Sequence, residues 1–158
     1  FFLKKEKINF QLFLVGENLD YKNNKLKKSL FENNLSEEVI LYGVKSDIRK
    51  TLHILDLLVL PSKSGEGFPN ILIEAMSTGL RCIATNIGES KFIIDKFGWI
   101  IESNDLDSLV CSIKDSINQS YEKRHYFEQK AREHIIQNFT LEKMLAKYSN
   151  LYRTKDSS

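Results

Sequence analysis

Hydrophobic residues in this chain fall into short buried runs that alternate with amphipathic stretches. The runs are apolar on both faces, which is typical of strands covered by helices on both sides of a sheet. Strands are predicted at residues 8–15, 39–43, 57–60, 81–86 and 98–102, and helices at 21–33, 47–55, 69–78, 91–95 and 104–117. This alternation, roughly every 20 residues, predicts an α/β fold built on a doubly wound parallel sheet with crossover helices.

The C-terminal third of the chain is predicted to be helical. A charged helix carries Phe127, Ala131 and Ile135 at every fourth position. Phe139 and Thr140 end this helix, and Thr140 is the expected N-cap of a final one. The apolar side of the final helix consists of Leu141, Met144, Leu145, Tyr148, Leu151 and Tyr152. A helix this apolar on one side needs a partner surface, so we expect the chain alone to self-associate as its concentration rises.

The stretch from Leu57 to Gly79 combines a buried strand, a glycine-bearing loop and a helix. Pro69 suits the first turn of that helix, and Gly79 suits its C-terminal cap. Because the helix is apolar on several sides, we expect it to be largely buried, with the carboxylate of Glu74 inside it. Glu66 in the loop and Glu74 in the helix therefore bracket a helix start whose N–H groups favour a phosphate.

Parallel α/β sheets bind ligands in the crevice at the carboxyl ends of their strands. The loops at those ends are residues 16–17, 43–45, 61–68 and 85–89. They hold Glu66 and several glycines, so the topology alone predicts a ligand site there. The first loop begins Gly16-Glu17-Asn18 and lacks the G-x-G-x-x-G pattern of a dinucleotide-binding turn.

Composition narrows the class of protein. With 158 residues, 42% of them hydrophobic and 28% charged, the chain suits one domain with a sizeable core. Its net charge of +2 is too near balance to argue for a nucleic-acid partner. Cys82 and Cys111 are interpreted as small buried residues in a reducing compartment. No run is long enough to cross a bilayer, and the opening FFLKKEK is unlike a signal peptide, so we expect a cytoplasmic protein.

The string E-G-F-P-N-I-L-I-E-A-M at residues 66–76 resembles the E-x7-E signature of retaining GT-B glycosyltransferases of the family 4 type. A strand ending in Pro-Ser precedes it, and G-L-R-C-I-A-T-N-I-G-E-S follows where the family commonly has G-x-P-V-x-A-T-D-x-G. The resemblance extends from Leu12 to Tyr152. Arg81 stands where the family usually has Pro, and Asn86 where Asp is common.

This resemblance implies transfer of a sugar from a nucleotide-sugar donor to an acceptor, with retention, in the synthesis of cell-surface polysaccharide or glycolipid. Glu66 would be the catalytic residue that holds the hydroxyls of the donor sugar, and Glu74 would bind the ribose. The backbone from Gly67 to Asn70 would hold the diphosphate, and the base would lie near residues 43–46 and Ser62. The full set of donor-binding residues implied is Gly16, Glu17, Ser62, Gly67, Phe68, Pro69, Asn70 and Glu74. No cofactor and no metal are expected.

The resemblance also implies a domain organisation. Residues 1–139 would be the Rossmann-like donor-binding domain of a GT-B enzyme, truncated at its N-terminus. Residues 140–158 would be a helix that packs on a missing N-terminal domain, which binds a saccharide or lipid-linked acceptor. The family places an Arg and a Lys for the donor phosphates just upstream of Phe1, so we interpret the chain as a fragment. The full-length protein would be cytoplasmic, with peripheral association at the inner face of a membrane.

Competing interpretations remain open at this point. A non-catalytic nucleotide-binding α/β module would share the same motifs but transfer no sugar. A receiver-like or flavodoxin-like domain is disfavoured because Asp56 precedes its strand rather than following it. Asp105-Leu106-Asp107 matches the D-x-D metal signature of another glycosyltransferase fold, but its position at the start of a helix favours a capping role.

Overall fold

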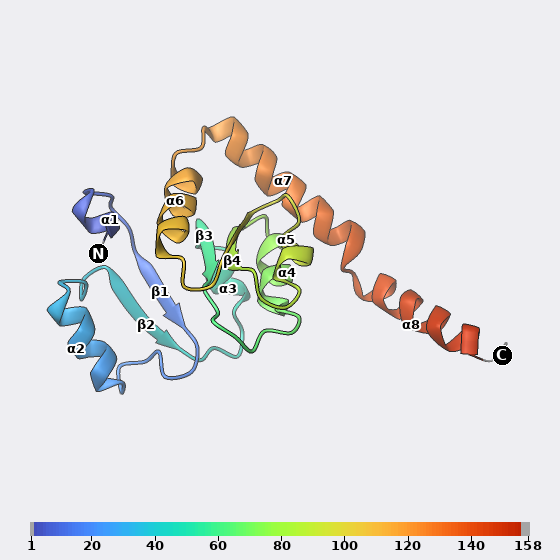
Figure 1. Cartoon of the computed structure of the whole chain (residues 1–158), viewed down its shortest axis with the longest axis horizontal. Helices are drawn as coiled ribbons and strands as arrows, with labels where there is room; N and C mark the ends of the chain where they lie inside the picture. The colour runs from blue at the N-terminus through green and yellow to red at the C-terminus, as the bar shows by residue number, and fades with distance from the viewer. Residues whose placement is uncertain (1, 156–158) are drawn as a thin grey trace. The chain divides into compact units, whose positions relative to one another are not determined.

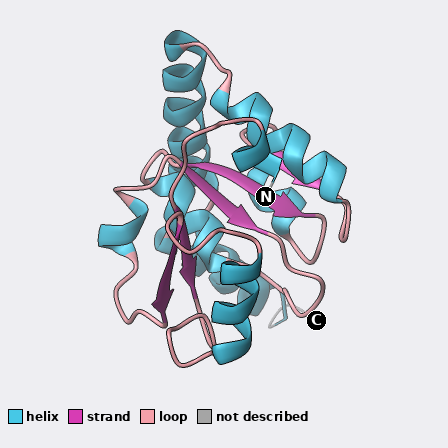
Figure 2. Cartoon of the chain, turned by 90° about the vertical axis from the view of Figure 1, so that its left-hand side faces the viewer, coloured by secondary structure: helices cyan, strands magenta, loops and turns pink. Residues whose placement is uncertain are grey.

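The computed structural model describes residues 2–155, with side chains described for 2–146 and 148–150. The chain forms two compact units, Phe1–Ile48 and Arg49–Ser158, each with its own parallel sheet. Within each sheet the strand arrows point the same way in Figure 2. The predicted α/β class is therefore confirmed, with the strands divided between two sheets rather than joined in one.

The first unit contains α1 (Phe2–Lys5), β1 (Leu12–Val15), α2 (Asn24–Glu32) and β2 (Val39–Gly43). Strand β1 begins four residues later than predicted because its partner β2 begins only at Val39, which lies opposite Leu12. Helix α2 begins later than predicted for a local reason: the Asn23 side chain accepts a hydrogen bond from the Leu26 N–H and so caps the helix.

The second unit is built on a three-stranded parallel sheet in the order β3-β4-β5. Its strands are β3 (Leu57–Leu60), β4 (Arg81–Thr85) and β5 (Trp99–Ile101). Its helices are α3 (Arg49–Leu52), α4 (Asn70–Ser77), α5 (Ser90–Ile94), α6 (Leu106–Ile117), α7 (Tyr121–Asn138) and α8 (Leu141–Lys155). Figure 1 shows α6 on one face of this sheet and α4, α5 and α7 on the other, as in a doubly wound fold.

Two helices of the second unit have bounds that differ from the predicted ones by two residues or more, and the other differences in this unit are of one residue. Helix α3 is shorter than predicted, because tight hydrogen-bonded turns at His53 and Ile54 redirect the chain into β3. Helix α6 begins at Leu106 rather than Asn104, because Asp105 is its N-cap. In the described part of the chain, no helix combines the length and the apolar character needed to cross a membrane.

The core of the second unit surrounds β4, whose five residues are all buried. Helices α4 and α5 cover it with Leu72, Met76, Ile93 and Ile94, none of which exposes any surface. Cys82 lies in β4, and its burial raises the pKa of the thiol. Cys111 is exposed on α6, so its predicted burial is wrong. The apolar stripe of that helix includes Leu109, Val110 and Ile113, and Cys111 falls outside it.

A buried charge fastens the start of β4 to its surroundings. The Arg81 guanidinium donates to the backbone oxygen and the hydroxyl of Ser116 in α6, and to the Asp56 carbonyl oxygen before β3. Its Nε lies 3.8 Å from a Glu128 carboxylate oxygen in α7. Burial and the nearby Arg124 hold the pKa of Arg81 below its usual value. Arg81 lies at the amino end of β4, opposite the carboxyl-end loops.

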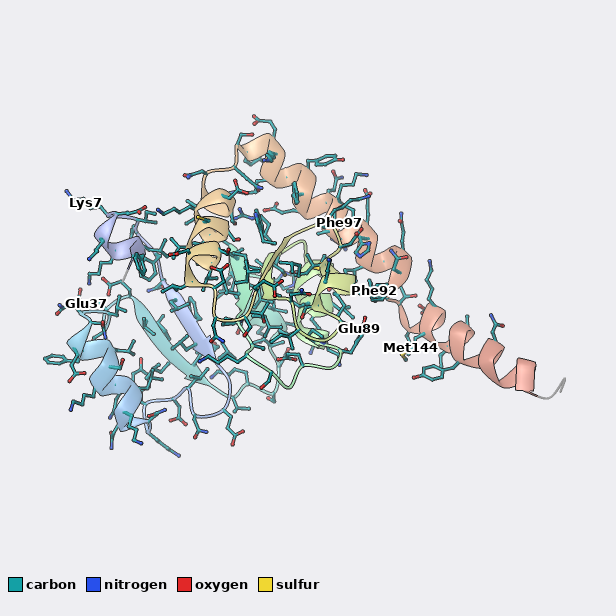
Figure 3. All side chains as sticks on the ribbon, in the orientation of Figure 1. Lys7, Glu37, Glu89, Phe92, Phe97 and Met144 are labelled. Carbon is teal, nitrogen blue, oxygen red and sulfur yellow. The ribbon has the colours of Figure 1, made fainter. Side chains whose placement is uncertain are left out.

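Helix α8 extends away from the sheet of its unit (Figure 1). Its predicted N-cap is confirmed, because the Thr140 hydroxyl accepts a 3.4 Å hydrogen bond from the Lys143 N–H. The apolar residues that were expected on one side are exposed by 49–61%, and Met144 among them is labelled in Figure 3. These exposed residues are Leu141, Met144, Leu145 and Tyr148. The side chains of Leu151 and Tyr152 lie outside the described residues.

Candidate functional site

The loop between β3 and α4, residues 61–69, is held at its base by hydroxyl groups. The Ser62 hydroxyl donates a 2.7 Å hydrogen bond to Oε1 of Glu66. The Thr85 hydroxyl, at the end of β4, donates to the Ser62 carbonyl oxygen at 2.7 Å. Ser62 and Glu66 are both half-buried. The loop is therefore tied to the neighbouring strand, and the Glu66 carboxylate has a fixed neutral donor on one of its oxygens.

A close backbone approach holds the middle of the same loop. Gly88 lies in the turn between β4 and α5 with φ +55°, in the region that favours glycine. A Cβ atom there would be 2.2 Å from the Glu66 carbonyl oxygen and 2.4 Å from that of Gly67. Beside it, the Glu89 N–H donates a 2.9 Å hydrogen bond to the Gly67 carbonyl oxygen. The turn therefore packs directly against the backbone of Glu66 and Gly67, and only glycine at position 88 permits this close packing.

The start of α4 offers backbone donors without a side-chain cap. Pro69 is the N-cap residue, is buried, and makes no side-chain capping hydrogen bond. N–H groups in the first turn of a helix lack intrahelical partners and carry partial positive charge, so they attract anions. Gly67 is exposed, and a Cβ atom built on it would have no neighbour within 4 Å. A phosphate group can therefore reach the backbone of this segment from the solvent.

Glu74 is exposed on α4, so the expectation that it is buried is wrong. Helix α4 packs one face against β4 and α7, and that face carries Leu72, Ala75 and Met76. Glu74 and Asn70, four residues apart, are both exposed and lie together on another face. Because apolar residues lie on several sides of α4, the sequence did not reveal which face of the helix is exposed to solvent. Exposure makes Glu74 more accessible to a ligand than the sequence suggested.

The sequence did not predict a polar pair, Asn86 and Glu102, in the segments that follow β4 and β5. The Asn86 side-chain amide donates a 3.0 Å hydrogen bond to Oε1 of Glu102, and both residues are exposed. The Asn86 N–H also donates to the carbonyl oxygen of Ile101, the last residue of β5. Glu102 is the last residue of the strand predicted at 98–102. A carboxylate at the carboxyl end of a parallel strand could therefore have indicated a residue of this site. An Asp at position 86 would bring two carboxylates together, whereas Asn supplies a donor.

Gly16 and Glu17 lie in the first unit, at the carboxyl end of β1. The Gly16 N–H donates a 3.0 Å hydrogen bond to the Gly43 carbonyl oxygen, and the Gly43 N–H donates to Leu19 at 2.9 Å. The loops after β1 and β2 therefore meet, and Glu17 is exposed beside them. The other predicted site residues all belong to the second unit, in the β3–α4 segment: Ser62, Glu66, Gly67, Phe68, Pro69, Asn70 and Glu74.

The D-x-D sequence caps a helix, as predicted. Asp105 accepts hydrogen bonds from the Ser108 N–H at 2.9 Å and from its hydroxyl at 2.6 Å. These bonds hold the pKa of Asp105 below its usual value. Over the residues whose placement is described, the structure brings together no cluster of three or more His, Cys, Asp or Glu that suits a metal ion.

Solved structures share this architecture. A glycosyltransferase from Rickettsia africae ESF-5 matches with a TM-score of 0.86 over 97% of this chain and 42% of its own, at 26% identity. Staphylococcus aureus TarM, in a complex that contains UDP, matches at 0.76 over 95% of this chain and 30% of its own, at 29% identity. The chain therefore has the α/β fold found in GT-B glycosyltransferases.

The chain belongs to the family of glycosyl transferases group 1, whose model matches residues 2–134. An Escherichia coli UDP-Gal:alpha-D-GlcNAc-diphosphoundecaprenol alpha-1,3-galactosyltransferase is 34% identical over 121 residues, which are 75% of this chain and 30% of the relative. A Staphylococcus aureus poly(ribitol-phosphate) alpha-N-acetylglucosaminyltransferase is 30% identical over 155 residues, 96% of this chain and 30% of the relative. The chain thus spans less than a third of the length of either relative.

Replacing Gly88 with alanine should disturb the packing of the turn after β4 against the β3–α4 loop. The added methyl group would collide with two carbonyl oxygens and sit on a left-handed backbone, which together cost about 2–4 kcal/mol. We expect Gly88→Ala to lower the free energy of unfolding by that amount, measured by urea denaturation. Gly67→Ala is the matched control and should stay within about 0.5 kcal/mol, because its methyl group meets open space. Equal stability of the two variants would contradict the close approach described here.

Proposed function

We propose that this chain is the donor-binding half of a glycosyltransferase that transfers a sugar from a nucleoside-diphosphate sugar with retention. The observation that carries the proposal is the β3–α4 segment. In it, a supported loop and a helix start without a side-chain cap lie between two carboxylates, the half-buried Glu66 and the exposed Glu74. Membership of the group 1 family supports transferase chemistry. Two relatives, a galactosyltransferase and an N-acetylglucosaminyltransferase, support a hexose donor.

The proposed chemistry divides the substrate among these groups. The backbone N–H groups of Gly67, Phe68 and Asn70 hold the diphosphate and stabilise the negative charge that grows as it leaves. Glu74 accepts hydrogen bonds from the ribose hydroxyls. Glu66 holds the hydroxyls of the donor sugar near the reacting carbon, and its bond from Ser62 fixes the carboxylate without neutralising it. Gly16 and Glu17, in the first unit, keep the donor-binding role that the family resemblance implies.

The proposal extends to a longer protein. Residues 1–139 serve as the donor-binding domain, and α8 packs on an N-terminal domain that binds a saccharide or lipid-linked acceptor. The reaction uses no metal, because the N–H groups at the start of α4 offset the charge of the diphosphate. The enzyme works in the cytoplasm, at the inner face of the membrane, in polysaccharide or glycolipid synthesis. The E. coli relative is named for a GlcNAc-diphosphoundecaprenol acceptor and the S. aureus relative for poly(ribitol-phosphate), and both names support that setting.

Glu66 and Glu74 should have separable effects on turnover in the complete enzyme. Glu74→Gln removes a contact to the ribose, which does not change during the reaction, so it should raise KM for the donor more than it lowers kcat. Glu66→Gln removes a contact that strengthens as the sugar becomes positively charged, so it should act mainly on kcat. Each effect should be roughly ten- to a hundredfold, from the value of a charged hydrogen bond.

The measurement is steady-state kinetics of both variants with the nucleotide sugar as the varied substrate. Near wild-type kinetics for both variants would contradict the E-x7-E assignment. Nucleotide affinity without any transfer by the complete wild-type protein would instead favour a non-catalytic binding module.

The exposed face of α8 should make the isolated chain self-associate. Four apolar residues on this helix are about half exposed, and an apolar face of this kind marks an interaction site. Sedimentation velocity should show the average mass rising with concentration. Leu145→Glu should abolish the rise, while Lys143→Glu on the same helix is a matched control and should preserve it. A strictly monomeric wild-type chain at high concentration would refute the expectation.

A further inference from the structure

A cluster of aromatic rings joins the β3–α4 loop to the end of α7. The Phe139 ring lies 6.2 Å from that of Phe68 and 5.5 Å from that of Phe92, measured between centroids. The His134 imidazole lies 5.5 Å from Phe139 and 5.0 Å from Phe97. These five residues form the aromatic cluster, and Figure 3 labels Phe92 and Phe97 within it. Phe139 contacts three of the other four members.

His134 is held firmly at the base of the aromatic cluster. Its Nε2 lies 3.1 Å from the Ile93 carbonyl oxygen in α5, and its Nδ1 lies 3.2 Å from the side-chain nitrogen of Asn138. One neutral tautomer satisfies both contacts, with Nε2–H donating to Ile93 and Nδ1 accepting from Asn138. The ring is therefore fixed between α5 and α7, and it gives Phe139 a firm surface.

Phe68 is the point at which this cluster touches the proposed donor site. It lies between Gly67 and Pro69, and its ring remains 46% exposed while resting on Phe139. Three hydrogen bonds also restrain the loop: the Ser62 hydroxyl to Glu66, the Thr85 hydroxyl to the Ser62 carbonyl oxygen, and the Glu89 N–H to the Gly67 carbonyl oxygen. All three act before Phe68 in the chain. The contact with Phe139 is a further restraint, on the segment whose N–H groups lead into α4.

We propose that Phe139 is a positioning residue for the donor loop and acts through the ring of Phe68. The inference rests on the proposed function, since it assigns Phe139 a role in presenting the Gly67 and Phe68 N–H groups to a diphosphate. When a loop samples several conformations, ligand affinity falls in proportion to the fraction that can bind. An aromatic pair favours its own conformation by about three- to tenfold, so its loss lowers that fraction correspondingly.

The test compares three substitutions in the 158-residue chain, with UDP as the probe, titrated by calorimetry. Phe139→Ala should weaken UDP binding by about three- to tenfold. Phe139→Tyr keeps the ring and should restore binding to within about twofold of wild type. Phe127→Ala is the matched control, because Phe127 lies in α7 but outside the aromatic cluster. Its ring stacks on that of Trp99, with 6.2 Å between the centroids. It should leave UDP affinity unchanged.

Amide hydrogen exchange provides a second measurement that needs no ligand. The Glu89 N–H is bonded to the Gly67 carbonyl oxygen, so its exchange rate reports opening of the loop. Phe139→Ala should raise that rate by about three- to tenfold relative to Ile83 in β4, and Phe127→Ala should not. Equal effects of Phe139→Ala and Phe127→Ala on both measurements would overturn the proposal, because they indicate only a general loss of stability.

The two proposals fail in different ways. If wild type binds UDP and Phe139→Ala changes neither affinity nor Glu89 exchange, the positioning role is wrong and the proposed function stands. If the complete protein binds none of UDP, GDP and ADP, the proposed function fails. The exchange rates then decide by themselves whether Phe139 orders the loop.

Discussion

The close approach of Gly88 to the carbonyl oxygens of Glu66 and Gly67 is the contact on which the candidate site depends. It brings the turn after β4 against the loop after β3, two segments that adjacent parallel strands deliver to the same edge of the sheet. The loop cannot move toward this turn without a collision, so the contact limits the positions of its carboxylate and its N–H groups. The absence of a side chain at position 88 is therefore as important as the acids themselves.

The charges at this edge follow one pattern. The carboxylates of Glu66 and Glu102 accept hydrogen bonds from neutral groups, the Ser62 hydroxyl and the Asn86 amide, rather than from cations. A neutral donor orients a carboxylate and leaves its charge available to a hydroxyl group or a developing positive charge. The buried charge of the unit, Arg81, lies at the amino end of β4, where it joins strands and helices. Structural and candidate functional charges thus occupy opposite ends of the sheet.

Local signals in the sequence predicted much of this structure. The strands at 39–43 and 57–60 match their predicted bounds, and Asp105 and Thr140 cap helices as expected. Features that depend on distant segments were missed. The exposure of Glu74 follows from where α7 lies, and the ring contact of Phe68 with Phe139 spans most of the second unit. Neither leaves a periodic pattern, because each reflects packing between elements far apart in the chain.

The central claim is that the backbone from Gly67 to Asn70 binds the diphosphate of a nucleotide sugar. The most direct test is a titration of the ¹⁵N-labelled chain with UDP, followed through the amide chemical shifts. If this backbone binds the diphosphate, the Gly67, Phe68 and Asn70 amides should show saturable shifts, with smaller changes at Glu89, whose N–H bonds to the Gly67 carbonyl oxygen. Saturable shifts confined to other loops, with these four amides unchanged, would contradict it.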